Sequence, residues 1–169
     1  MPIDTGLTDA LVVKLFHLGK SDQEIAEQFG VTVQAVSKRR MKLGLARRPV
    51  SRQVNEWLAT RWKVFSPQEG TGHHNRYSAK ALRAWLRLRL GDKTLSAKQI
   101  DMAERWERRL RREGLVLCYD PDTEEGWYYR PRLISDDRLV IDWPKDLPFP
   151  DERFRRALTL PREGAARDV

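Results

Sequence analysis

The sequence predicts a mainly α-helical protein with a short N-terminal helical domain, a second and larger helical domain, and a small β-hairpin toward the C-terminus. Three observations support this fold class. Residues 7–44 contain three short amphipathic segments, and a capping Thr or Ser stands before each. All six tryptophans lie beyond residue 50, and four of them fall within helical patterns that run to residue 113. Residues 115–120 and 126–132 are apolar or aromatic around a turn-forming segment, which is typical of a hairpin.

Residues 21–44, with the sequence SDQEIAEQFGVTVQAVSKRRMKLG, have the pattern of two helices joined by a tight turn. Ser21 and Glu24 are spaced as a capping box. Gly30 occupies the turn, where a positive φ is expected, and Thr32 is expected to cap the second helix. Together with a first helix over residues 7–19, this pattern predicts an N-terminal helix-turn-helix domain.

The second helix of this motif is expected to bury an apolar stripe of Val33, Val36 and Leu43 and to face the major groove of DNA with its polar side. Gln donates and accepts at an adenine edge, and Lys donates to guanine. We therefore expect Gln34, Ser37 and Lys38 to read bases. The expected contacts to the DNA backbone are Thr32, Arg39, Lys42, Arg47 and Arg48.

Position 39 or 40 of this pattern normally carries an apolar residue, so either Arg39 or Arg40 is expected to lay its stem across the core. An alternative interpretation of the whole segment is a helical hairpin that contacts protein instead of DNA.

The distribution of charge predicts a second DNA-binding surface. The net charge is +8, which favours a polyanionic partner. Basic and acidic residues number 8 and 5 in residues 1–50, 15 and 7 in residues 51–114, and 9 and 12 in residues 115–169. The excess of positive charge therefore peaks outside the helix-turn-helix. The expected contacts are His74, Asn75, Arg76, Lys80, Arg83, Arg105, Arg108, Arg109 and Arg112. The alternative is a solvated helix surface held by i,i+4 ion pairs such as Glu104–Arg108.

The second domain is divided into elements by its capping and turn residues. Helical spacing runs from Ser51 to Phe65, and Arg47-Arg48-Pro49 before it reads as a linker. The alternation over residues 86–90 resembles a strand, but the preceding periodicity favours helix. The expected elements are helices over 51–65, 78–90, 96–113 and 149–158, a loop over 68–77, the hairpin, and a short strand over 139–143. The expected domain bounds are 1–46, a basic linker 47–52, a Trp-rich DNA-binding domain 53–160, and a disordered tail 161–169.

Cysteine, histidine and acidic residues are the remaining candidates for catalysis or metal binding. Cys118 is the one cysteine and reads as a buried thiol in a strand. His73 and His74 are adjacent, so they do not point at one ion, and the acidic residues near the hairpin read as turns. We expect no catalytic residue, metal or cofactor. No apolar run is long enough to span a bilayer and no signal peptide is visible, so the expected location is a reducing cytoplasm without membrane contact.

The order of these parts resembles the immunity repressors of temperate actinobacteriophages, particularly mycobacteriophages. A helix-turn-helix at residues 21–44 is joined by Arg47-Arg48-Pro49 to a larger, Trp-rich, basic domain. The resemblance implies a repressor of lytic transcription that maintains lysogeny and superinfection immunity in the cytoplasm or nucleoid of a bacterial host. It further implies a monomer whose two domains bind an asymmetric site in double-stranded DNA. Two other readings stay open: a DNA recombinase or nuclease, and a small terminase-like packaging subunit.

Overall fold

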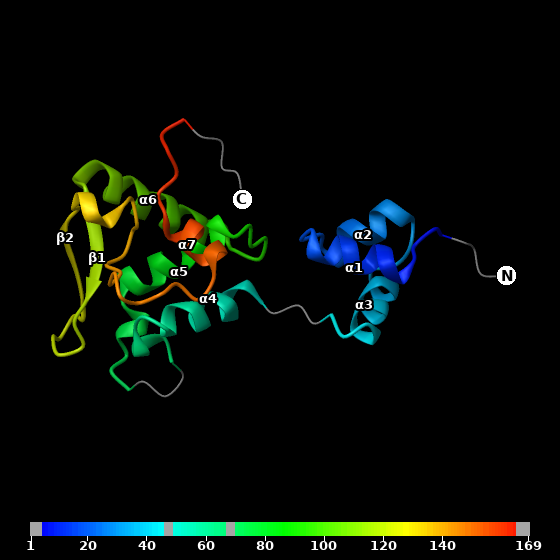
Figure 1. Ribbon diagram of the computed structural model, residues 1–169, viewed down its shortest axis with the longest axis horizontal. Helices are drawn as coiled ribbons and strands as arrows, with labels where there is room; N and C mark the ends of the chain where they lie inside the picture. The colour runs from blue at the N-terminus through cyan, green and yellow to red at the C-terminus, as the bar shows by residue number, and fades with distance from the viewer. Residues whose placement is uncertain (1–4, 46–48, 67–69, 165–169) are drawn as a thin grey trace. The chain divides into compact units, whose positions relative to one another are not determined.

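The computed structural model describes residues 5–45, 49–66 and 70–164, and it is mostly helical with one small hairpin (Figure 1). Contacts between residues divide the chain into two units, Met1–Arg48 and Pro49–Val169, and each is described by itself. Arg47 and Arg48, the arginines of the expected linker, lie outside the described residues. The end of the expected disordered tail, 165–169, does so too.

The N-terminal unit consists of α1 (Asp9–His17), α2 (Asp22–Phe29) and α3 (Val33–Lys42). The capping box of Ser21 and Glu24 is confirmed, because each side chain bonds the other's backbone N–H. Gly30 ends α2 with φ 63°, and Thr32 caps α3 by accepting a hydrogen bond from the Ala35 N–H. The buried side chains that hold the unit together are Leu7, Val12, Leu15, Ile25, Ala26 and Val36.

The predicted burial of Val33 is wrong, since this side chain is 42% exposed. Val33 is the first residue of α3, directly after the Thr32 cap. Val36, one turn further on, is fully buried and Leu43 packs partly against the same core. The apolar stripe of α3 therefore begins one turn later than the sequence pattern indicates.

The described residues of the C-terminal unit form four α-helices and a two-stranded antiparallel sheet. In the hairpin, β1 (Leu115–Tyr119) pairs with β2 (Trp127–Pro131) so that Leu117 lies opposite Tyr129. The expected hairpin is confirmed. Short 3-10 segments lie at Lys63–Phe65, His73–Asn75 and Ile134–Asp136. The elements are α4 (Val50–Ala59), α5 (Tyr77–Arg89), α6 (Ala97–Glu113), β1 (Leu115–Tyr119), β2 (Trp127–Pro131) and α7 (Glu152–Leu158).

Tryptophans contribute much of the core of this unit. Trp85 and Trp106 are essentially buried and meet edge to face, with ring centroids 5.8 Å apart. Their indole N–H groups donate to Glu107 and to Tyr129, at 2.8 and 2.9 Å. Cys118 is buried within β1, and burial raises the pKa of its thiol, which agrees with the expected structural role.

Two expected boundaries are wrong. The helix expected over 51–65 ends at Ala59, because the chain there turns into the short 3-10 segment that buries Val64 and Phe65. The helix expected to start at Ser78 begins instead at Tyr77, and the Ser78 hydroxyl lies 2.8 Å from the Tyr129 hydroxyl.

Two further expectations concern strands. The strand expected over 139–143 is reduced to two isolated bridges, Leu117 with Ile141 and Leu139 with Thr159. The alternation over residues 86–90 lies almost entirely within α5, so helix is confirmed there. Within the described residues, no helix is both long and apolar enough to cross a bilayer.

Candidate nucleic-acid interface

The exposed face of α3 holds the three residues expected to read bases. Gln34 and Lys38 are exposed and Ser37 is half-buried, and these side chains form no hydrogen bond or ion pair with any other described residue. A shallow hollow of α3 is lined by Val33, Gln34, Ser37, Lys38 and Met41. The structure therefore brings the expected base-reading residues together, and adds the exposed Met41, which sequence analysis missed.

Arg40 fastens this face to the rest of the N-terminal unit. Its Nε donates to Asp22 Oδ1 at 3.0 Å and its Nη2 donates to Oδ2 at 3.1 Å, while Nη1 donates to the Leu45 carbonyl at 2.6 Å. The Arg40 and Asp22 side chains are only 11% and 14% exposed. The expectation that one of the two arginines covers the core is thus confirmed for Arg40.

Of the residues expected to contact the DNA backbone, Arg39 and Thr32 form contacts within the unit and Lys42 does not. Arg39 donates from Nη1 to the Leu7 carbonyl and lies 3.4 Å from Asp9, so it joins α3 to the N-terminal end of the unit. Thr32 caps α3 with its hydroxyl and is exposed. Lys42 is exposed and has no partner among the described residues.

On the C-terminal unit, the expected α5 contacts line a hollow of about 300 Å³ between α4, α5 and α6. Lys80 is exposed there and has no ion-pair partner among the described residues. Arg83 is half-buried, and its burial lowers the pKa of the guanidinium from its ordinary value. Arg87, beside them, is held by Asp92 at 2.7 Å. Ser51, in the first turn of α4, completes the nearer wall.

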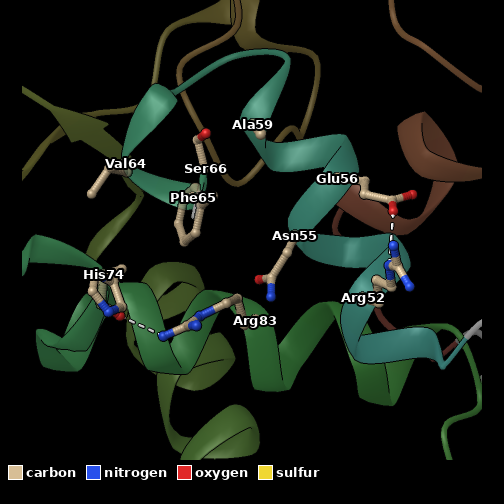
Figure 2. Close-up of a pocket in the computed structure, with 9 residues that line it drawn as sticks. All are labelled: Arg52, Asn55, Glu56, Ala59, Val64, Phe65, Ser66, His74 and Arg83. Carbon is tan, nitrogen blue, oxygen red and sulfur yellow. Dashed lines mark hydrogen bonds and ion pairs between the residues drawn. The ribbon is translucent and has the colours of Figure 1, made fainter. Parts of the chain in front are cut away.

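Arg83 also borders a neighbouring hollow of about 430 Å³, shown in Figure 2. There its guanidinium donates to the His74 carbonyl, and it also donates to the Ala79 carbonyl at 3.2 Å. Asn55 projects from α4 between the two hollows, and its buried Oδ1 has no hydrogen-bond partner among the described residues. Arg83 therefore stabilises the fold through two backbone carbonyls, and its guanidinium also lines both hollows.

The remaining residues expected to contact DNA differ in whether an acidic side chain neutralises them. Arg105 pairs with Asp101 at 2.9 Å on α6, and Arg112 pairs with Glu113 at 3.0 Å, both on exposed surface. Arg108 is exposed and lacks a partner among the described residues. The other pairs are Arg109 with Glu113 at 3.5 Å and Arg76 with Glu125 at 3.5 Å; Asn75 is exposed.

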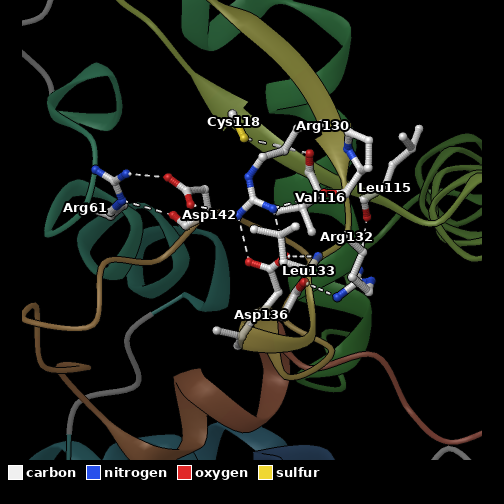
Figure 3. A network of polar contacts seen from close by, with 11 residues as sticks. Arg61, Leu115, Val116, Cys118, Arg130, Arg132, Leu133, Asp136 and Asp142 are labelled. Atoms are coloured by element: carbon white, nitrogen blue, oxygen red, sulfur yellow. Dashed lines mark hydrogen bonds and ion pairs between the residues drawn. The ribbon is translucent and has the colours of Figure 1, made fainter.

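Several arginines of the C-terminal unit are committed to internal contacts, which sequence analysis did not foresee. Figure 3 shows Arg61 and Arg130 on either side of Asp142, at 3.2 and 2.9 Å. Arg130 also donates to both carboxylate oxygens of Asp136, at 2.7 and 2.8 Å, and these hydrogen bonds raise the pKa of Arg130. Arg132 donates to the carbonyls of Leu139 and Leu115 at 2.6 and 3.0 Å. These three arginines therefore stabilise the chain around the hairpin and the segment that follows it.

His73 is likewise structural. It is buried, with Nδ1 2.9 Å from the Tyr119 hydroxyl and Nε2 3.0 Å from the Glu124 carbonyl. Among the described residues, no group of three or more His, Cys, Asp or Glu side chains is arranged to hold a metal ion.

The fold and this surface define a small, basic, mainly helical protein with an open helix face on its N-terminal unit. No family model matches the chain. The chain is 31% identical over 145 residues to a repressor-like immunity protein of Mycobacterium phage L5, covering 80% of this chain and 74% of that relative. The chain therefore belongs to the family of phage repressor-like immunity proteins, which agrees with the resemblance inferred from its sequence.

Proposed function

We propose that this protein is a phage repressor that binds double-stranded DNA sequence-specifically through α2 and α3, acting as a helix-turn-helix. The observation that carries the proposal is the free polar face of α3. Gln34 and Lys38 have no partner among the described residues, and the first turn of α3, which Thr32 caps, is exposed. A helix of this length fits the major groove of B-DNA.

Each polar residue of α3 has a role that follows from its chemistry. Gln34 forms two hydrogen bonds with an adenine edge, Lys38 donates to guanine, and Ser37 bonds either base. Thr32 and Lys42 contact phosphates at the two ends of the helix. Arg39 adds charge near the backbone while it holds its internal partners, and Arg47 and Arg48 are proposed as further phosphate contacts.

The C-terminal unit supplies a second set of contacts to the phosphates of the same duplex. Lys80 and Arg83 line one hollow with Ser51, and α4 starts there without a side-chain cap. Free N–H groups at a helix start attract phosphate oxygens. Lys80 and Arg108 are the strongest candidates, because neither is neutralised by a described residue. The ion-paired set of Arg76, Arg105, Arg109 and Arg112, with His74 and Asn75, contributes more weakly.

In this proposal one chain binds an asymmetric site as a monomer. A single three-helix reader contacts few base pairs, so a second surface on the same chain replaces the second half-site that a dimer supplies. The relative's name, repressor-like immunity protein, supports a role in repressing lytic genes and excluding related phages from a lysogen. No cofactor is required for binding of this kind.

Selection of binding sites from random duplexes, with the mass of the bound complex measured alongside, tests this function. We expect one asymmetric sequence to be enriched and one chain of 19.8 kDa to be bound per duplex. Enrichment of a palindrome with two chains would contradict the monomer. No enrichment of any sequence would contradict sequence-specific binding, and nicking of supercoiled DNA or assembly into rings would favour the nuclease or packaging alternative.

A further inference from the structure

Two apolar side chains share the polar face of α3 with the residues proposed to read bases. Met41 is 70% exposed and Val33 is 42% exposed, although both are large and apolar. They line the same shallow hollow as Gln34, Ser37 and Lys38. Isolated exposed apolar residues are ordinary, but these two share one surface with three hydrogen-bonding side chains.

The spacing of these residues forms one continuous row. Val33, Ser37 and Met41 follow one another at intervals of four residues, so they stack along one side of the helix. Gln34 and Lys38 form the neighbouring row at the same interval. The two apolar groups therefore lie at opposite ends of the surface that the proposed function assigns to base reading.

The core of the N-terminal unit does not need either side chain. Val36 already fills the space beneath α3 and is fully buried, and Arg40 covers the next turn with its stem. Lys38 and Lys42 add positive charge in the neighbouring row that begins at Gln34, and they have no partner among the described residues. This combination of apolar groups and free cations complements a polyanion that carries apolar groups, which is the major groove of DNA.

We propose that Val33 and Met41 form two apolar subsites for the C5-methyl groups of thymines. This inference rests on the proposed function and adds which bases the helix recognises. The thymine methyl group is the characteristic apolar feature of the major-groove edge. The eight-residue separation places the side chains about 12 Å apart along the helix axis, so the two methyl groups belong to different, non-adjacent base pairs. Gln34, Ser37 and Lys38 read the bases between and beside them.

The test replaces each thymine of the selected duplex by deoxyuridine, one at a time, and measures the dissociation constant of the full-length chain. Deoxyuridine keeps the hydrogen-bonding pattern and removes only the methyl group. Loss of one buried methyl contact is expected to weaken binding about fourfold. We expect this loss at two non-adjacent positions and little change at other thymines.

Met41→Ala and Val33→Ala connect each position to its side chain. We expect Met41→Ala to weaken binding to the thymine duplex about fourfold and to become insensitive to deoxyuridine at one of the two positions. Val33→Ala should behave in the same way at the other position. Leu18→Ala is the matched control, because Leu18 is 65% exposed after α1 and lies outside α3; it should keep both sensitivities.

The outcomes separate this inference from the proposed function. If Gln34→Ala loses sequence preference but deoxyuridine has no effect, the methyl subsites are wrong and the base-reading helix stands. Equal losses by Met41→Ala on thymine and deoxyuridine duplexes would also overturn the subsites. If no sequence is enriched from random DNA, both proposals fail together.

Discussion

Arg40 on α3 holds the carboxylate of Asp22 at the start of α2 through two of its nitrogens, at 3.0 and 3.1 Å. The third nitrogen donates to the Leu45 carbonyl beyond the end of α3. This one side chain therefore ties both helices and the following turn together, where the sequence pattern would otherwise supply an apolar residue. The position of the α3 face depends on it.

Asp22→Ala should destabilise the N-terminal unit by about 2–4 kcal/mol, because it leaves a nearly buried guanidinium without its counter-ion. All six tryptophans lie in the C-terminal unit, so their fluorescence follows that unit alone. We expect the part of the far-UV circular dichroism transition that comes from α1, α2 and α3 to shift to less denaturing conditions. The fluorescence transition should stay in place. A paired replacement, Asp22→Leu with Arg40→Met, should recover most of the loss; equal shifts by both probes would contradict the assignment.

Gln34→Ala should reduce the preference for the selected site by about 1–3 kcal/mol while leaving binding to random DNA unchanged. The reason is that a base contact carries sequence information and a phosphate contact does not. Titration of cognate and random duplexes measures both. Gln28→Ala, an exposed glutamine on α2, is the matched control. Equal weakening on both duplexes would assign Gln34 to the backbone.

Lys80→Gln combined with Arg108→Gln should lower the slope of log binding constant against log salt by about 1–2, because each neutralised phosphate releases counterions. The measurement is the affinity between low and physiological salt. Lys145→Gln with Arg153→Gln removes the same charge from exposed positions outside the proposed surface and should leave the slope unchanged. Identical slopes for the two double variants would show that Lys80 and Arg108 act on DNA only through long-range charge and do not contact phosphates.

The pH dependence of the C-terminal unit should reflect Asp136. The hydrogen bond from Arg130 lowers the pKa of this carboxyl, with further help from the Leu133 N–H. A carboxyl whose pKa is lowered on folding stabilises the fold above its ordinary pKa, and this contribution is lost as the pH falls through the lowered value. Asp136→Asn should therefore cost about 2 kcal/mol at pH 7 and much less near pH 2. Denaturation followed by tryptophan fluorescence at both pH values measures this, and an equal cost at both would refute the ionic contribution.

Gly126→Ala should be far more damaging than Gly114→Ala. Both glycines have positive φ, 74° and 61°, which costs an alanine about 1–2 kcal/mol. A Cβ at Gly126 would also lie 2.5 Å from His73 Nδ1 and 2.7 Å from the Tyr119 ring, whereas a Cβ at Gly114 meets nothing within 4 Å. Denaturation midpoints compare the two variants, and similar losses would show that the His73 contact yields easily.

Local chemistry explains how much of the fold could be predicted. The capping box at Ser21, the turn at Gly30 and the end of α6 at Gly114 depend on residues close in sequence, and all three match the structure. The end of α4 depends on burial of Val64 and Phe65 against the rest of the unit. No local pattern reveals that contact.

The candidate site was predictable only in part for a related reason. Gln34 and Lys38 are free because they lie on the outer side of a short helix, which periodicity shows. An arginine that meets a distant carbonyl, as Arg132 meets Leu139, reads in sequence like an arginine that meets phosphate. The excess of charge in residues 51–114 therefore marks a basic unit, and the choice between Lys80 and Arg87 needs the fold.

A structure of the full chain bound to its selected duplex tests the central claim most directly. The account predicts that the face of α3 bearing Gln34, Ser37 and Lys38 lies in the major groove, with Lys80 and Arg108 near phosphates of the same duplex. An α3 face that packs against protein, or that lies away from the DNA while another surface contacts the bases, would contradict it.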